Sequence, residues 1–227
     1  MSLWTRILNP SGGLVYHYRA WRYSKKLWGE HKNQVSQFLE LWNPPRKTLV
    51  LIGPSGGYSL PLEWIGQFEK VVALEPDPVA RWIFEMRFKR KPLWLKDFRE
   101  IQRFENESYC ILFCNLLGQI NLETTTGIGF LLKQLVSGRP WASYHDIFSG
   151  PAFSFEHPIQ SPYGKLTIEE IKNKISVKQH AGVVELNDHA TLHSFEPTDR
   201  EKFLYWSWAL TPNQTQLIEG VLGGVRP

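Results

Sequence analysis

Apolar residues follow two different spacings along this chain, and the change of spacing divides it into parts. Residues 14–29 and 31–42 carry apolar side chains three or four positions apart, which predicts two helices with one buried face each. Asn43-Pro44-Pro45 ends the second helix. Near-continuous apolar runs follow, and they predict buried strands at residues 48–52, 70–75, 93–95, 109–114 and 141–147.

Helical patterns separate these runs, near residues 60–68, after Asp77 and around 128–137. Asp77 is a good N-cap, and Pro78 suits the first helical position. Strands that alternate with helices predict an α/β fold with a doubly wound, mostly parallel, Rossmann-like sheet.

The pattern changes after residue 148. Residues 149–166 are rich in Pro, Gly and Ser and predict a loop insertion, and Thr167-Ile168-Glu169-Glu170 predicts a capping box that opens a short helix. Residues 182–195 are expected to be extended. Two final apolar runs flank the turn signal Thr211-Pro212-Asn213 and predict a C-terminal antiparallel hairpin that closes the sheet, with strands at 202–210 and 216–222.

The chain has 227 residues with 42% apolar content, enough for a full core. We expect an N-terminal helical segment at 1–47 and a Rossmann-like domain at 48–227 with an insertion around 149–195. The net charge of the chain is +4. The excess of basic residues lies in residues 1–47, which hold eight Lys/Arg against two acids. The block 16–23 interleaves aromatic and basic residues, a pattern typical of RNA binding but also of an amphipathic helix that docks its aromatic face and leaves a solvated basic side. Its position before the first strand favours a lid or substrate-recognition role, with RNA binding as the alternative.

Cys110 and Cys114 lie four residues apart in a predicted buried strand, about 13 Å from one another and too far for a disulfide. Two buried thiols fit a reducing compartment. No apolar leader or membrane span is visible. The sequence therefore predicts a soluble, cytoplasmic protein with no membrane partner.

The turn after the first predicted strand reads Gly53-Pro54-Ser55-Gly56-Gly57. Small residues between a strand and a helix let the backbone approach a nucleotide-like ligand and donate N–H groups to it. A plain tight turn is the simpler interpretation. Gly-x-Ser-x-Gly also occurs at the nucleophile elbow of α/β-hydrolases. In that interpretation Ser55 would be the nucleophile and His193 its base. However, the elbow normally follows a central strand deeper in the sheet.

Glu75 lies 22 residues after Gly53, at the end of the next predicted strand. A carboxylate at that point can accept hydrogen bonds from two ribose hydroxyls. Asp97 and Asn115 end the third and fourth strands, so they share the same carboxyl edge of the sheet. Ligands bind at that edge in open α/β sheets, and the sequence therefore predicts an adenosine-type site there.

Four segments together resemble the successive motifs of class I S-adenosylmethionine-dependent methyltransferases: residues 49–60, 71–81, 96–98 and 113–118. The resemblance covers roughly residues 48–148 and implies S-adenosylmethionine as the cofactor, with an unknown methyl acceptor that is a small molecule or, as the alternative, RNA. It also implies a cofactor site formed by Gly53, Ser55, Gly56 and Gly57 near the methionine, Glu75 and Pro76 at the ribose and adenine, Asp97 and Phe98 at the adenine, and Asn115, Leu116 and Leu117 on the methyl-donor side.

One position departs from the family. Class I methyltransferases usually have Asp or Glu two residues before the first glycine, where this chain has Leu51. The departure leaves open a non-catalytic or degenerate member of the fold that serves as a binding protein. An NAD-dependent oxidoreductase is the third hypothesis, and the spacing of the glycines departs from Gly-x-Gly-x-x-Gly.

Methyl transfer depends mainly on positioning, and a base is needed only where the acceptor must lose a proton. Candidate catalytic groups near the carboxyl edge are His145, Asp146 and Asn115. His189 and His193 would lie about 13 Å apart on a strand, too far to share a metal ion, and no third ligand is evident. We expect no metal site.

Overall fold

The computed structural model describes residues 13–44, 46–104, 107–115, 135–155, 166–177, 186–189 and 202–224. Its chain begins with two helices, α2 (Gly13–Tyr23) and α3 (Gly29–Trp42). The first is shorter than the sequence predicts, because the chain turns between Tyr23 and Gly29. That turn brings Trp28 into the core, fully buried, where its indole N–H donates to the Leu210 carbonyl at 3.1 Å.

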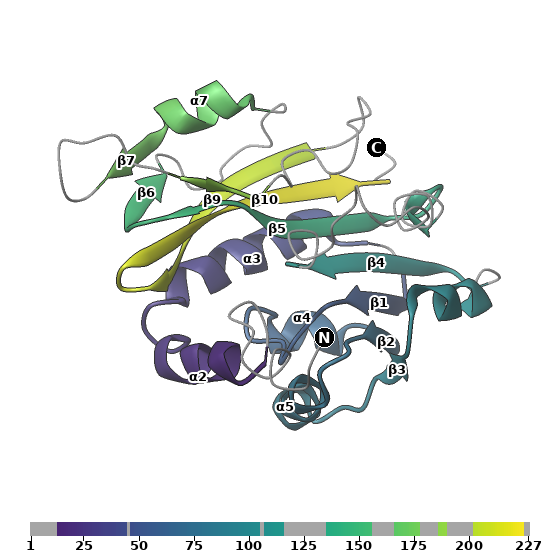
Figure 1. The fold of residues 1–227 in the computed structure, drawn as a ribbon. Helices are drawn as coiled ribbons and strands as arrows, with labels where there is room; N and C mark the ends of the chain where they lie inside the picture. The colour runs from purple at the N-terminus through teal and green to yellow at the C-terminus, as the bar shows by residue number, and fades with distance from the viewer. Residues whose placement is uncertain are drawn as a thin grey trace.

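A mixed sheet forms the centre of the molecule (Figure 1). Five neighbouring strands run parallel, in the order β3-β2-β1-β4-β5, and β10 and β9 follow as an antiparallel hairpin. The doubly wound sheet with a C-terminal antiparallel hairpin is therefore confirmed. The strands are β1 (Thr48–Ile52), β2 (Lys70–Leu74), β3 (Leu93–Leu95), β4 (Tyr109–Cys114), β5 (Trp141–Gly150), β9 (Lys202–Thr211) and β10 (Gln214–Gly223).

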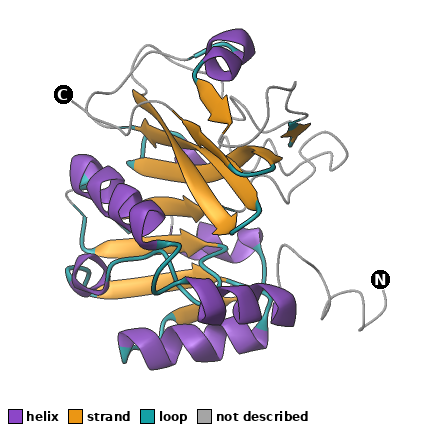
Figure 2. Ribbon diagram, turned by 90° about the vertical axis from the view of Figure 1, so that its left-hand side faces the viewer, coloured by secondary structure: helices purple, strands orange, loops and turns teal. Residues whose placement is uncertain are grey.

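Helices cover both faces of the sheet (Figure 2). One buried cluster joins α2, α3, α4 (Leu62–Gly66) and α5 (Pro78–Phe88) to one face of the strands. A second cluster packs the 3₁₀ helix η1 (Phe98–Phe104) and α7 (Ile168–Asn173) on the other face. Because side chains alternate along a strand, neighbouring residues of β1 enter different clusters: Leu49 and Leu51 the first, Val50 and Ile52 the second.

Two helix starts follow the predicted capping chemistry. The Asp77 carboxylate accepts from the N–H of Val79 at 2.8 Å, and Pro78 occupies the first turn of α5. At α7, the Thr167 hydroxyl and the Glu170 carboxylate form the reciprocal capping box. Both helix starts are thus set by local sequence.

The region after residue 148 holds more strand than expected. Strand β5 continues to Gly150, three residues beyond its predicted end, and β6 (Phe153–Phe155) pairs with β7 (Ile175–Val177) in a small separate sheet. A two-residue strand, β8 (Asn187–Asp188), pairs with the end of β5. In both views this small sheet and α7 lie at the end of the molecule opposite α2 and α5 (Figures 1 and 2). Most of the predicted helix 128–137 and of the extended segment 182–195 lies outside the described residues.

Both cysteines are buried and form no disulfide. Burial raises the pKa of each thiol to about 12. Within the described ranges, no helix has the length and apolar character needed to cross a membrane.

Candidate functional site

The glycine turn lies where the strand order reverses. Strand β1 is flanked by β2 on one side and by β4 on the other, so the loops that leave β1 and β4 depart in opposite directions across the sheet. A crevice at such a reversal is where ligands bind in open α/β sheets. Ser55 has a left-handed backbone, with φ of 50°, which turns the chain sharply after β1.

Glu75 connects this turn to the end of β2. Its Oε2 accepts from the N–H of Ser55 at 2.8 Å, and its Oε1 accepts from the N–H of Asp77 at 3.0 Å. Desolvation raises the pKa of the buried Glu75 carboxyl above its ordinary value, and the two N–H donors oppose that rise. A carboxylate has about four lone-pair positions, so each Glu75 oxygen keeps one acceptor position beyond these bonds.

Gly56 and Gly57 are packed closely by side chains of the protein itself. A Cβ at Gly56 would lie 2.8 Å from Cγ2 of Ile83, and one at Gly57 would lie 2.5 Å from Cε2 of Phe88. Both neighbours belong to α5. The absence of side chains at Gly56 and Gly57 therefore allows α5 to pack against the turn. This packing explains the two glycines structurally, in addition to the predicted approach of a ligand.

Helix α2, in the N-terminal segment, contacts the residues that follow the glycine turn and the residues that follow β2. His17 Nδ1 lies 2.8 Å from the Tyr58 hydroxyl, and its Nε2 lies 3.2 Å from Oδ2 of Asp77. The Tyr16 ring packs on Tyr58, with 5.8 Å between ring centroids. Burial, then the neighbouring Tyr58 and Glu75, raise the pKa of Tyr16 above its ordinary value.

The remaining predicted cofactor residues follow the ends of β2, β3 and β4. Pro76 and Asp97 are exposed, and Phe98 packs partly against the second cluster. Asn115 has a left-handed backbone, with φ of 51°, and its side-chain oxygen accepts from the N–H of Asp146 at 2.9 Å. Leu116 and Leu117 lie outside the described residues.

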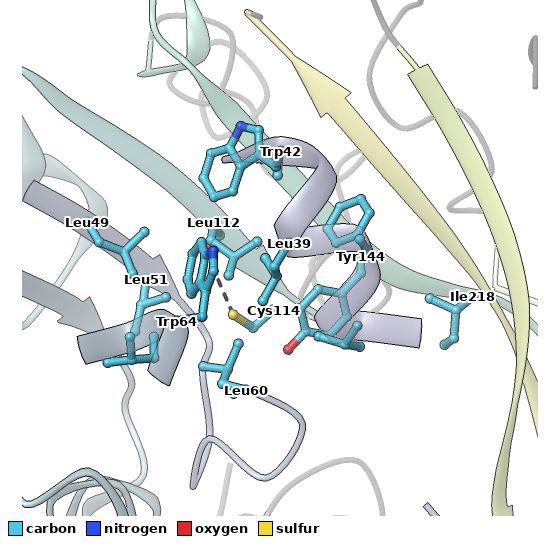
Figure 3. Packing of buried hydrophobic residues seen from close by; sticks show 14 of the residues in the cluster. Leu39, Trp42, Leu49, Leu51, Leu60, Trp64, Leu112, Cys114, Tyr144 and Ile218 are labelled. Atoms are coloured by element: carbon cyan, nitrogen blue, oxygen red, sulfur yellow. Dashed lines mark hydrogen bonds between the residues drawn. The ribbon is translucent and has the colours of Figure 1, made fainter. Parts of the chain in front are cut away.

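Leu51 occupies an apolar environment. It is fully buried in the first cluster, and Figure 3 shows it beside Leu49 and near Leu60 and Trp64. A carboxylate at that position would lose its hydration among mainly apolar side chains. Any polar group that holds an amino group near the turn must come from another element.

The two strand-five candidates lie in different environments. His145 is fully buried and lies within hydrogen-bond distance of Ser143, with its Nε2 3.4 Å from Oε1 of Glu219, which is also fully buried. Asp146 lies at the carboxyl edge beside Asn115, and its Oδ2 is 2.8 Å from Nδ1 of His189.

Sequence analysis considered His189 only as a metal ligand together with His193 and did not single out Ser149, yet the structure brings both residues to Asp146. Nε2 of His189 lies 2.9 Å from the Ser149 hydroxyl. The hydrogen bond to Asp146 raises the pKa of His189 above its ordinary value. Nothing in the local sequence signals this arrangement, because β8 is too short to be recognised as a strand. In the described part of the chain, no three His, Cys, Asp or Glu side chains form a group suited to hold a metal ion.

The site thus belongs to an open α/β sheet with polar groups gathered at its carboxyl edge. No family model and no curated protein matches the chain. Solved structures similar to it include an amino pentose methyltransferase from Micromonospora echinaspora (14% identity, TM-score 0.45, covering 93% of this chain and 97% of that one). Others are an O-methyltransferase from Bacillus cereus (13%, 0.43, 96% and 94%) and magnesium protoporphyrin IX methyltransferase from Synechocystis PCC 6803 (12%, 0.44, 96% and 88%).

Proposed function

We propose that this chain is an S-adenosylmethionine-dependent methyltransferase whose acceptor is unidentified. The observation that supports it most is the arrangement of Glu75, a buried carboxylate at the end of β2 that is hydrogen-bonded to the N–H of Ser55 in the turn after β1. An acid in this position beside a glycine turn suits the ribose of an adenosyl group.

The residues at the edge fit such a cofactor. Each Glu75 oxygen already accepts one backbone N–H, which fixes the carboxylate and leaves one acceptor position for each of the two ribose hydroxyls. Pro76, Asp97 and Phe98 would then lie on the adenine side, Gly53, Ser55, Gly56 and Gly57 on the methionine side, and Asn115, Leu116 and Leu117 on the methyl-donor side.

S-adenosylmethionine, when bound, supplies an electrophilic methyl group. The chain's own residues then have to hold the reactants in line and exclude water. Asn115 is suited to positioning because the N–H of Asp146 fixes its side-chain oxygen. Where the acceptor must lose a proton, the Asp146–His189 pair next to Asn115 can take it, whereas the fully buried His145 is not part of the proposed site.

Helix α2 forms part of the proposed site as a lid. Its His17 contacts Tyr58, just after the glycine turn, and Asp77, two residues after Glu75, and its Tyr16 ring packs on Tyr58. We therefore propose that residues 1–47 serve to cover the cofactor and recognise the acceptor, in place of the polar anchor that Leu51 cannot supply.

Calorimetric titration tests the proposal without an acceptor. The wild-type chain should bind S-adenosylmethionine and S-adenosylhomocysteine, and Glu75→Ala should weaken that binding at least tenfold. Glu75→Gln keeps the side-chain volume and controls for packing. Glu69→Ala is the matched acid control, because Glu69 is exposed and pairs with Lys47 on the surface; its affinity should equal wild type.

Three outcomes separate the hypotheses. No binding of either sulfur compound at millimolar concentration excludes the proposal, and binding of NAD instead would favour an oxidoreductase. Unchanged affinity in Glu75→Ala, in a variant that melts as a folded protein, would remove Glu75 from the site. Binding without turnover against a broad set of acceptors would favour the non-catalytic alternative that the apolar Leu51 suggests.

A further inference from the structure

Three side chains at the end of β5 have the connectivity of a nucleophile, a base and an acid. The Ser149 hydroxyl lies 2.9 Å from Nε2 of His189, and Nδ1 of His189 lies 2.8 Å from Oδ2 of Asp146. The two ring nitrogens thus have different partners, one hydroxyl and one carboxylate. This is the geometry by which an imidazole activates a serine.

An irregularity in β5 brings Asp146 and Ser149 together. On a regular strand, residues three apart face opposite sides of the sheet. Here the pairing with β10 slips: Ile218 pairs with Asp146, but Leu217 pairs with Phe148, so one extra residue stands in β5 between them. The bulge returns Ser149 to the face that carries Asp146.

The extra residue of the bulge, Ile147, also holds the backbone of His189 in place. The N–H of His189 donates to the carbonyl of Ile147 at 3.0 Å, and β8 pairs Asn187 with Ser149 just before it. His189 is therefore held at its backbone by the bulge and at its ring by residues on either side of the bulge. The backbone contact fixes the position of His189, and the two ring contacts fix the orientation of its imidazole.

The hydrogen bonds also determine which nitrogen carries the proton. Oδ2 of Asp146 accepts from Nε2 of Gln216 at 3.1 Å and faces Nδ1 of His189. A carboxylate only accepts, so the proton of the neutral ring lies on Nδ1 and Nε2 presents its lone pair. The Ser149 hydroxyl must then donate to Nε2, which is the direction that activates its oxygen.

We propose that Ser149 is a nucleophile for acyl transfer, with His189 as its base and Asp146 as the residue that positions the base. The Ser149 oxygen would bond to the carbonyl carbon of an ester while its proton passes to Nε2. The bond from that carbon to the leaving oxygen then breaks, and Nε2 returns the proton to the leaving alkoxide. Water repeats both steps on the acyl-serine and releases the acid. This activity does not depend on methyl transfer.

The chain contains its own control. Ser143, His145 and Glu219 form a second set of the same chemistry, with Ser143 Oγ 3.1 Å from Nδ1 of His145. All three are 0% exposed, whereas Ser149 is 7% exposed and the side chain of its base, His189, is 22% exposed. A small electrophile from solvent should therefore react with Ser149 in preference to Ser143.

Diisopropyl fluorophosphate tests the proposal on the full-length protein, because it marks activated serines without a matched substrate. Fluoride leaves as the phosphorus–oxygen bond forms. Intact mass and peptide mapping should find one adduct, on Ser149, which Ser149→Ala abolishes and which Ser143→Ala leaves at the wild-type rate. His189→Gln and Asp146→Asn should each slow labelling at least a hundredfold, and p-nitrophenyl acetate should acetylate the same serine.

The pH profile separates a base from a merely structural histidine. Labelling should speed up as His189 loses its proton. Asp146 and, more weakly, Asp188 hold that proton, so Asp146→Asn should move the midpoint of the profile to lower pH. Circular dichroism of each variant verifies folding. No adduct on folded wild-type Ser149, or an unchanged rate in folded His189→Gln, would overturn the proposal.

Discussion

The packing of α5 on the glycine turn predicts how the turn responds to a single methyl group. Gly57 has φ of 66°, and a Cβ there would lie 2.5 Å from Cε2 of Phe88 and 3.0 Å from Cδ2 of the fully buried Phe84. Gly57→Ala therefore combines an unfavourable backbone conformation with an overlap in the core. Phe84 and Phe88 stack with 4.3 Å between their ring centroids, so one ring cannot move without the other.

The two costs can be estimated separately. A left-handed backbone costs alanine about 1–2 kcal/mol, and a methyl group forced into a packed core costs about 1–3 kcal/mol. Their sum is roughly 2–5 kcal/mol in the free energy of unfolding, and each kcal/mol lowers Tm by about 2–4 °C in a chain of this length. We expect Gly57→Ala to melt roughly 4–20 °C below wild type in a calorimetric scan.

Two other glycines serve as matched controls. Gly138 also has a positive φ, of 68°, but no atom lies within 4 Å of a Cβ built on it, so Gly138→Ala carries the backbone cost alone. Gly66 ends α4 with open space around it and no positive φ, so Gly66→Ala should be neutral or more stable by up to about 1 kcal/mol. The expected order of Tm is Gly66→Ala, wild type, Gly138→Ala, Gly57→Ala.

The difference in Tm between Gly57→Ala and Gly138→Ala tests whether α5 packs as closely on the turn as the contacts indicate. Equal losses in Gly57→Ala and Gly138→Ala would mean that α5 yields to the methyl group without cost, and the packing argument would be wrong. A double-mutant cycle with Phe88→Leu adds a second check. If the Phe88 ring causes the overlap, the smaller side chain should recover part of the loss in Gly57→Ala, and additive effects would contradict that cause.

Three further predictions concern other parts of the chain. Burial lowers the pKa of His31 to about 3, so between pH 6.5 and 3 the unfolded chain binds a proton that the folded chain excludes. The free energy of unfolding should therefore fall by on the order of 4 kcal/mol as the pH drops from 6.5 toward 3. His31→Gln should reduce this pH dependence, as measured by urea titrations. Thr167→Ala should cost α7 about 1 kcal/mol and speed amide exchange of its first turn about fivefold, whereas Thr167→Ser should not. Cys110 and Cys114, whose pKa is raised to about 12, should resist Ellman's reagent at pH 8 until urea unfolds the protein.

Local chemistry made part of the fold predictable. Strands β1, β3 and β4 match their predicted bounds because their apolar runs end abruptly at polar residues, Gly or Pro. The helix starts at Asp77 and Thr167 were predictable for a similar reason, since a cap needs only residues within one turn of itself. The alternation of strands and helices predicted that these strands run parallel, but it did not predict their order in the sheet.

Features that depend on distant partners were not predictable. Helix α2 ends at Tyr23, and the turn after it buries Trp28, whose indole donates to Leu210, 182 residues away in sequence. Asp146 and Ser149 share a face only because β10 slips by one residue against β5, and an ideal strand would separate them. The same limit applies to the candidate site: the spacing of Glu75 from the turn was visible, but His17 and His189 join it through tertiary contacts.

The missing acid at Leu51 and the N-terminal addition are best understood together. A carboxylate at position 51 would be buried among apolar side chains, so the core of the sheet favours leucine there. Polar groups near the turn come instead from α2, where His17 bridges Tyr58 and Asp77, and from the loop ends that Glu75 ties together. Binding at this edge should therefore depend on α2 as much as on the strands. We therefore propose that α2, although it precedes the sheet, is a component of the candidate site.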